Sequence, residues 1–263
     1  MRNRRPMIAG IALAAALGLT GCASGGGTAD PGTSGGGRQV AQQLSADADL
    51  AAATAKLAQD TMRVEMEMAG ALSMKGVADG RTGDAEIDMD MGAAAQGLSM
   101  VMRKVGDDLY LKMGGELAGA LGGSSAKEWM HVDASKMKNG SLNLSDEGDP
   151  AGTKALLEAA TSVERVGEDG FKGTLDLTRS SRYKDNKEAL SALGTKATAV
   201  PFTAKKDSED RLTEVSIDLS GMGAGSGVMA ARYSDFGAPV TVKAPPASQV
   251  QEMPSQYAKM FGN

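Results

Sequence analysis

The sequence contains few residues that do chemistry, and it groups few of them together. There is one histidine, His131, and one cysteine, Cys22, so no cluster of zinc ligands is possible. The glycines are abundant but form no P-loop for phosphate binding. His131 lies in a short predicted strand with no nucleophile motif around it, and we interpret it as a bystander. The sequence therefore predicts a protein that is not an enzyme and has no cofactor.

A run of carboxylates is the next candidate site. Asp84, Glu86, Asp88 and Asp90 alternate with apolar residues, which places them on one face of a predicted strand. Carboxylates bind hard cations, but a strand spreads its side chains apart and no loop gathers these four around one ion. We interpret them as a solvated face and predict no metal site there.

Methionine is the third candidate ligand, because thioethers select soft metals such as Cu(I). Of 17 methionines, nine fall within residues 61–113. Three pairs project to one strand face: Met66 and Met68, Met89 and Met91, and Met100 and Met102. The alternation demands an apolar residue at each of these positions anyway, so copper binding is a minor alternative to a core role.

Strands must position these residues. The even-numbered residues from Met62 to Met74 form one apolar face and the residues between them are mostly polar, which predicts one long strand with a bend near Gly70. The pattern returns at 84–91, 98–103 and 108–113. Four one-sided strands joined by short polar or glycine-rich connections predict an antiparallel meander with one apolar face.

The rest of the chain adds helices and further strands. We predict helices at 44–59, with Ser45 as a cap, at 149–160, beginning at Asp149-Pro150, and at 183–193, ending at Gly194. Residues 248–260 are predicted to form either a closing helix or a loose tail. Further strands are predicted at 128–132, 162–167, 171–177, 200–205, 212–219 and 228–236, with Thr241-Val242 ending the sheet. Nine or ten strands with irregularly placed helices indicate an α+β fold, an antiparallel sheet with helices on one face.

The N-terminus has the pattern of a bacterial lipoprotein signal. Three arginines precede the apolar residues 8–19, and Leu19-Thr20-Gly21-Cys22 resembles a lipobox. In such signals the chain is cleaved before the cysteine, which becomes acylated. We therefore predict a signal peptide at 1–21, a flexible Gly/Ser-rich tether at 22–38, and a single folded domain at 39–263.

The net charge of the protein restricts the kinds of molecule that it is expected to bind. Removal of residues 1–21, which contain three arginines and no acidic residue, changes the net charge from −5 to −8. An acidic body does not indicate a nucleic-acid partner, and it is not drawn to anionic lipid. The acyl chains of Cys22 must then supply the membrane anchor, on the extracytoplasmic face of the cell membrane.

The apolar face has two interpretations. Either it is a filled core, or it lines a cavity, since flexible methionines fit varied apolar shapes and few aromatic residues are available to fill the interior. Ten residues are the predicted cavity lining: Met66, Met68, Ile87, Met89, Met100, Met102, Leu109, Leu111, Leu175 and Ile217.

Several segments resemble the LppX/LprG-type lipoproteins of actinobacteria, which are related in shape to the LolA/LolB carriers. The lipobox, the tether and the alanine-rich first helix come first. Val105-Gly106-Asp107-Asp108-Leu109-Tyr110-Leu111 is similar to that family's strand entry, and Glu128-Trp129 is similar to a position that follows it. Tyr233-Ser234-Asp235-Phe236-Gly237, Val240-Thr241-Val242 and Ala244-Pro245-Pro246 resemble its ending.

The resemblance implies a strongly curved antiparallel half-barrel whose concave face is covered by helices and encloses an apolar cavity. It also implies binding or movement of lipids or glycolipids at the cell envelope. We therefore expect an anchored lipoprotein that holds a hydrophobic ligand for carriage or presentation. The alternative is an anchored protein-interaction or sensor module with a filled core.

Overall fold

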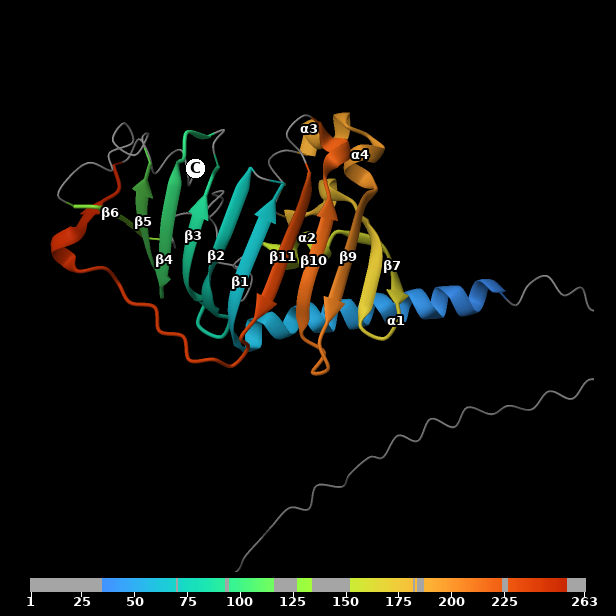
Figure 1. Ribbon diagram of the computed structural model, residues 1–263. Coiled ribbons are helices and arrows are strands. Elements are labelled where there is room, and N and C mark those ends of the chain that lie inside the picture. The colour runs from blue at the N-terminus through green and yellow to red at the C-terminus, as the bar shows by residue number, and fades with distance from the viewer. Residues whose placement is uncertain are drawn as a thin grey trace, which may run out of the picture.

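The computed structural model describes residues 35–69, 71–92, 95–115, 127–133, 152–181, 183, 187–223 and 227–254 of the 263-residue chain. Within these residues a single large sheet dominates, and every helix except the first is short (Figure 1). The protein is mostly β, with twelve described strands where the sequence predicted nine or ten.

Two antiparallel meanders form the sheet, and β1 pairs with β11 to join them. The strand order is β12-β6-β5-β4-β3-β2-β1-β11-β10-β9-β8-β7, and only the β12–β6 pair is parallel among the described strands. The first meander consists of β1 (Thr61–Met68), β2 (Leu72–Asp79), β3 (Asp84–Asp90), β4 (Ser99–Val105), β5 (Asp108–Gly114) and β6 (Trp129–Asp133). The second consists of β7 (Ala160–Val166), β8 (Gly170–Leu175), β9 (Val200–Lys206), β10 (Leu212–Asp218) and β11 (Val228–Ser234).

The prediction of one long bent strand through Gly70 was wrong, because the chain reverses there into the β1–β2 hairpin. Met68 pairs with Leu72, and the amide of Ala71 donates to the carbonyl of Met68 at 2.7 Å. An odd number of residues separates the two paired ends, so even-numbered residues stay on the same face after the turn. Alternation alone therefore cannot distinguish this hairpin from one strand.

The first helix is longer than predicted. α1 (Gly35–Ala55) begins within the expected tether and continues as a 3₁₀ turn, η1 (Lys56–Gln59), so Ser45 lies inside the helix and does not cap it. Ala46, Leu50, Ala53 and Leu57 form a buried stripe at helical spacing. This stripe packs α1 across the face of the second meander, where the helix contacts β7 and β10 (Figure 1).

The later helices are shorter than predicted. α2 is Thr153–Leu157, and Asp149 and Pro150 lie outside the described residues. In place of one helix at 183–193 there are α3 (Lys187–Ala192) and α4 (Thr195–Thr198). Gly194 lies between α3 and α4 with φ of 56°, a conformation that favours glycine. The chain also forms 3₁₀ turns η5 (Leu177–Arg179) and η7 (Ser220–Met222).

The sheet does not end at Thr241-Val242. After β11 the chain runs along the lower ends of the strands in Figure 1 to the opposite edge, where η8 (Ala247–Gln249) leads into β12 (Val250–Glu252). β12 pairs with β6, so the prediction of a closing helix or a loose tail at 248–260 was wrong for its described part. Residues 255–260 lie outside the described residues.

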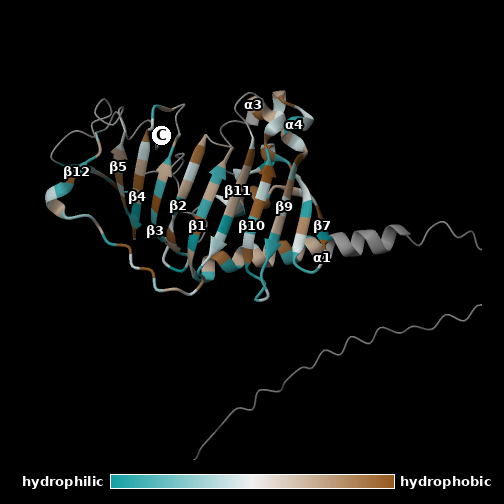
Figure 2. Ribbon diagram, in the orientation of Figure 1, coloured by the Kyte–Doolittle hydropathy of each residue, from teal (hydrophilic) through white to brown (hydrophobic). Residues whose placement is uncertain are grey.

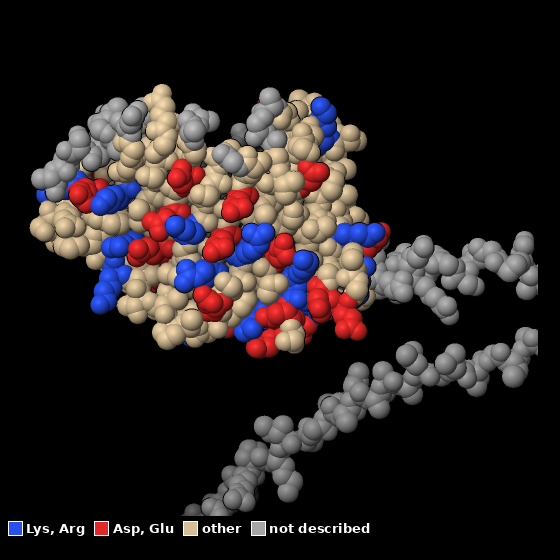
Figure 3. All heavy atoms as spheres, in the orientation of Figure 1, with Lys and Arg blue, Asp and Glu red and all other residues tan. Residues whose placement is uncertain are grey.

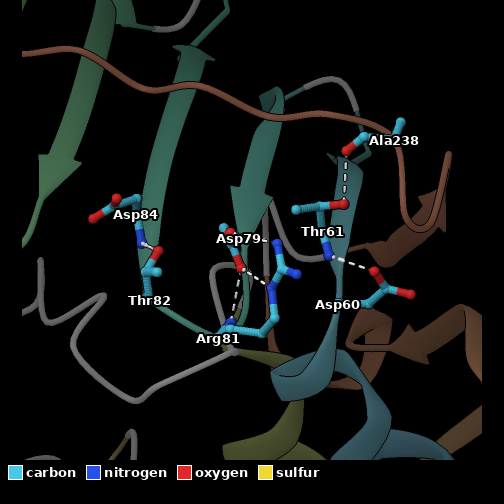
Figure 4. A network of polar contacts seen from close by, with 7 residues as sticks. All are labelled: Asp60, Thr61, Asp79, Arg81, Thr82, Asp84 and Ala238. Carbon is cyan, nitrogen blue, oxygen red and sulfur yellow. Dashed lines mark hydrogen bonds and ion pairs between the residues drawn. The ribbon is translucent and has the colours of Figure 1, made fainter.

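We call residues 235–246, between β11 and η8, the return segment. Polar contacts hold its start against the first meander (Figure 4). The hydroxyl of Thr61 donates to the carbonyl of Ala238 at 2.7 Å, and the amide of Thr61 donates to Asp60 Oδ1 at 2.8 Å. In the adjacent β2–β3 turn, Arg81 donates from two nitrogens to the carboxylate of Asp79 at 2.9 and 2.8 Å. These bonds fix the corner where β1, β2 and the return segment meet.

The sheet is not the strongly curved half-barrel that the sequence predicted; it is a large mixed sheet without strong curling. Strong curvature requires β-bulges or glycine kinks in the strands. Among the described pairs, only β9–β10 and β7–β8 have register shifts, and the pairing of β1 to β6 is uninterrupted. The main strand contacts of α1 are with β7 and β10 of the second meander, and α2 packs against α1.

Candidate functional site

The helix-covered side of the sheet is apolar across both meanders, and hydrophobic and hydrophilic residues alternate along its strands (Figure 2). A central row crosses seven adjacent strands through directly opposed residues: Tyr233, Val64, Gly76, Ile87, Met102, Leu111 and Met130. Val64, Ile87 and Leu111 are each 0% exposed. The central row is therefore part of the hydrophobic core and is not accessible to a ligand.

The neighbouring row is made of methionine. Five opposed residues on β1 to β5 form it, and we call them the methionine row: Met66, Met74, Met89, Met100 and Met113. Four of its members are 5–7% exposed, and Met89 is half-buried. The row therefore lies at the margin of the core.

The structure places all ten predicted lining residues on this apolar side, eight of them buried and Met68 and Met89 half-buried. They do not form one site. Met66, Met89 and Met100 belong to the methionine row, whereas Ile87, Met102 and Leu111 belong to the central row. Leu175 lies in the second meander, as does Ile217, and Leu109 pairs with Val132 near the far edge.

An apolar pocket opens elsewhere on this side, between α1, α2 and β7. Its volume is about 270 Å³. Its lining includes Leu50, Ala51, Ala55, Leu157, Ala160 and Val163, together with the charged residues Asp47, Lys154 and Glu158. Burial raises the pKa of Asp47 above its usual value.

None of the ten predicted residues lines this pocket. The general argument from the sequence was that too few aromatic residues are available to fill the interior. The pocket is bordered by three small residues, Ala51, Ala55 and Ala160. The position was missed because it depends on how α1 crosses β7, which no local pattern contains. The alanine content of residues 46–55 was the one sequence feature that could have indicated the position of the pocket.

His131 lies on the outward face of β6, held between two carboxylates. Its Nε2 is 2.7 Å from Asp108 Oδ1, and its Nδ1 is 2.9 Å from Glu252 Oε1 on β12. Partial burial lowers the pKa of His131, but hydrogen bonds with Asp108 and Glu252 outweigh it and leave the pKa above its usual value. Both ring nitrogens are occupied, so this imidazole ties β12 to the sheet and is not poised to take a proton from a substrate.

The outward face of the sheet carries interleaved charges of both signs (Figure 3). One row crosses β9, β10, β11, β1, β2 and β3 with strictly alternating sign, and we call it the charge row: Lys205, Glu214, Arg232, Glu65, Lys75 and Asp88. Opposite charges that face each other across strands stabilise the pairing register.

The four acidic residues of β3 have separate partners. Asp84 accepts a hydrogen bond from the amide of Gly106 at 2.8 Å, and Glu86 forms an ion pair with Arg103 at 2.9 Å. Asp90 accepts from the amide of Gly92 at 2.8 Å, and Asp88 faces Lys75. In the described part of the chain, no group of three acidic, histidine or cysteine residues is placed to hold a metal ion.

The chain matches no protein-family model, and no curated protein matches it in sequence. Among the helices of the described residues, none combines the length and the apolar character that crossing a membrane requires. Cys22 and the expected signal peptide lie outside the described residues.

Proposed function

We propose that the protein is a membrane-anchored lipoprotein of the cell envelope that binds a hydrophobic molecule, specifically an alkyl chain of a lipid or glycolipid. The observation that carries this proposal is the pocket of about 270 Å³ between α1, α2 and β7. Its volume is just below the roughly 300 Å³ at which small-molecule sites begin. It suits one alkyl chain better than a lipid with several chains.

The energetics of such binding are simple. Each methylene moved from water into an apolar pocket contributes about 0.8 kcal/mol. The aliphatic lining provides this burial, and the charged residues Asp47, Lys154 and Glu158 in the same lining offer hydrogen bonds to a polar head group. The proposed ligand is therefore amphipathic, with its chain against Leu50 and Val163.

The position of the pocket fits a membrane anchor. Residues 23–34 separate Cys22 from the start of α1. A chain of this length reaches at most about 40 Å when fully extended. Acylation of Cys22 with diacylglycerol and palmitate would therefore keep α1, which forms one wall of the pocket, close to the membrane from which a lipid is taken.

A second candidate, an anchored protein-interaction module, is favoured by a groove on the outward face. The groove has a volume of about 590 Å³ and crosses β1 to β4. Its lining combines polar residues, among them Glu65, Glu67 and Lys75, with apolar ones, including Met66, Met74, Met89 and Met100 of the methionine row. Its mixture of charged and apolar residues resembles a protein-binding surface more than a lipid site. In this alternative the apolar side is simply the core.

Filling the pocket tests the lipid proposal. We expect Ala51→Leu together with Ala55→Leu to weaken binding of a fluorescent fatty acid at least tenfold, because both alanines line the pocket on α1. Ala48→Leu with Ala52→Leu is the matched control, since these two exposed alanines of α1 are outside the lining. Fluorescence titration measures both affinities in a Cys22→Ser background. Equal affinities in the two variants would contradict the pocket assignment.

A further inference from the structure

The methionine row brings five thioethers side by side in a way that the order of the sequence does not show. Directly opposed residues on neighbouring strands have Cβ atoms about 4.5–5.5 Å apart, whereas alternate residues along one strand are nearly 7 Å apart. Met74, Met89 and Met100 are opposed across β2, β3 and β4. Because methionine has three rotatable side-chain bonds, neighbouring sulfur atoms of this row can converge on one point.

Packing alone does not account for this row. Strands favour β-branched and aromatic residues, and the same line of the sheet continues onto β11, β10, β9 and β8 as Ala231, Val215, Ala204 and Phe171. In this row of opposed residues, methionine therefore occurs only on β1 to β5, and the strands beyond Met66 carry residues without sulfur. An apolar face requires hydrophobic residues there but does not require thioethers.

The sulfur-bearing residues are also within reach of solvent. Met66 and Met100 are 5% exposed and Met74 is 7% exposed, against 0% for Val64 and Ile87 in the adjacent central row. Met89, in the middle of the row, is half-buried. A small ion can therefore reach these side chains without unfolding of the core.

The charges behind the row favour a cation. On the outward face of β1 to β3, the groove contains the carboxylates of Glu65, Glu67, Asp88 and Asp90, and Lys75 is the one basic residue in its lining. The same groove is also lined by Met74, Met89 and Met100, and a net negative lining raises the local concentration of positive ions.

We propose that the methionine row is a binding site for Cu(I), a soft monovalent ion, with the thioethers of Met74, Met89 and Met100 as its ligands. Soft thioether ligands select Cu(I) over hard ions and need no deprotonation to bind. Binding involves no change of oxidation state. The row is separate from the pocket lined by Leu50 and Val163, so this function does not depend on lipid binding.

The test uses the full chain with Cys22→Ser, which removes the one thiol. Cu(I) is titrated under anaerobic conditions in competition with a chromophoric chelator. The ladder variant carries Met74→Leu, Met89→Leu and Met100→Leu, a swap that conserves volume. The control carries Met62→Leu, Met130→Leu and Met253→Leu, three buried methionines outside the row. Circular dichroism and thermal melting verify the fold of each.

We expect the parent to bind Cu(I), the control to bind within threefold of the parent, and the ladder variant to bind at least a hundredfold more weakly. X-ray absorption of the parent complex should show sulfur neighbours without nitrogen. If the ladder variant does not fold, Met89→Leu alone should weaken binding at least tenfold. A parent that does not compete for Cu(I), or a ladder variant with parental affinity, would overturn the proposal.

Discussion

His131 is the residue whose interpretation differs most between the sequence and the structure. The sequence suggested a bystander, but its two ring nitrogens join Asp108 of β5 to Glu252 of β12. The raised pKa means that the folded protein holds the histidine proton more tightly than the unfolded chain does. The pair of carboxylates therefore makes a contribution to stability that depends on pH.

The first prediction concerns this dependence. Because the folded pKa is above the unfolded one, the contribution is fully present below the unfolded pKa of about 6.5 and is lost as pH rises through the folded pKa. We expect His131→Gln to lower the free energy of unfolding more at pH 5 than at pH 8.5, measured by urea denaturation.

The control for this experiment is Glu214→Gln, which breaks the ion pair of Glu214 on β10 with Lys205 on β9 and leaves His131 and its two carboxylates unchanged. Its effect should be the same at both pH values. If His131→Gln also costs the same at both, the two carboxylates do not stabilise the imidazolium.

The pairing of a strand depends on the residues opposite it on both neighbouring strands, and the charge row is an example on the outward face. Glu65 lies between Arg232 and Lys75. Glu65→Lys would create three like charges in a line and should cost about 1 kcal/mol of stability, since like charges directly opposite are destabilising. The loss should shrink in 1 M salt, which screens exposed charges.

Glu67→Lys is the matched control for this second prediction. Glu67 is two residues along the same strand on the same face, but its opposed residues are Ser73 and Ala230, which carry no charge. Its effect should be smaller and less dependent on salt. Equal losses in the two variants would mean that the charge row does not contribute to strand pairing.

On the apolar face, Gly173 of β8 lies where a side chain would clash with Phe202 of β9. A Cβ at Gly173 would be 2.7 Å from Phe202 Cε1 and closer still to the carbonyl of Ser162. We expect Gly173→Ala to destabilise the protein by about 1–3 kcal/mol through overpacking. Gly221→Ala, with nothing within 4 Å of its added Cβ, should change the stability by less than about 0.5 kcal/mol in the same denaturation assay. A neutral Gly173→Ala would contradict this packing.

The sequence predicted the strands better than their arrangement. Alternation located β3 to β6 and β9 to β11 closely, because a half-buried strand must alternate. It did not reveal the reversal at 69–71, since both strands of that hairpin keep their apolar residues at even numbers. Pairing across strands also lies outside local pattern, so neither the methionine row nor the pocket under α1 was predicted.

Predictions from local sequence also failed near both ends of the folded region. Residues 35–38 were assigned to a flexible tether from their glycine content, yet α1 begins at Gly35. Val250–Glu252 was predicted to belong to a closing helix or a loose tail, yet its pairing with β6 makes it a strand. Tertiary contacts override weak local preference in such short segments.

In the molecule as a whole, two meanders share one apolar side, and each offers a different site on it. The second meander, with α1 and α2, forms the pocket of about 270 Å³, and the first carries the methionine row. The return segment then crosses from β11 to β6 and brings β12 to the far edge (Figure 1). The proposed lipid site and the proposed thioether site therefore lie on separate parts of the same sheet.

Lipid binding is the central claim, and native mass spectrometry tests it most directly. The Cys22→Ser chain would be purified from its own host without detergent and examined before and after incubation with the host's lipid extract. We predict an additional mass that extracts into organic solvent, fragments as a molecule with an alkyl chain, and is reduced by Ala51→Leu with Ala55→Leu. A ligand-free mass before and after incubation would contradict the claim and favour a protein partner at the outward groove.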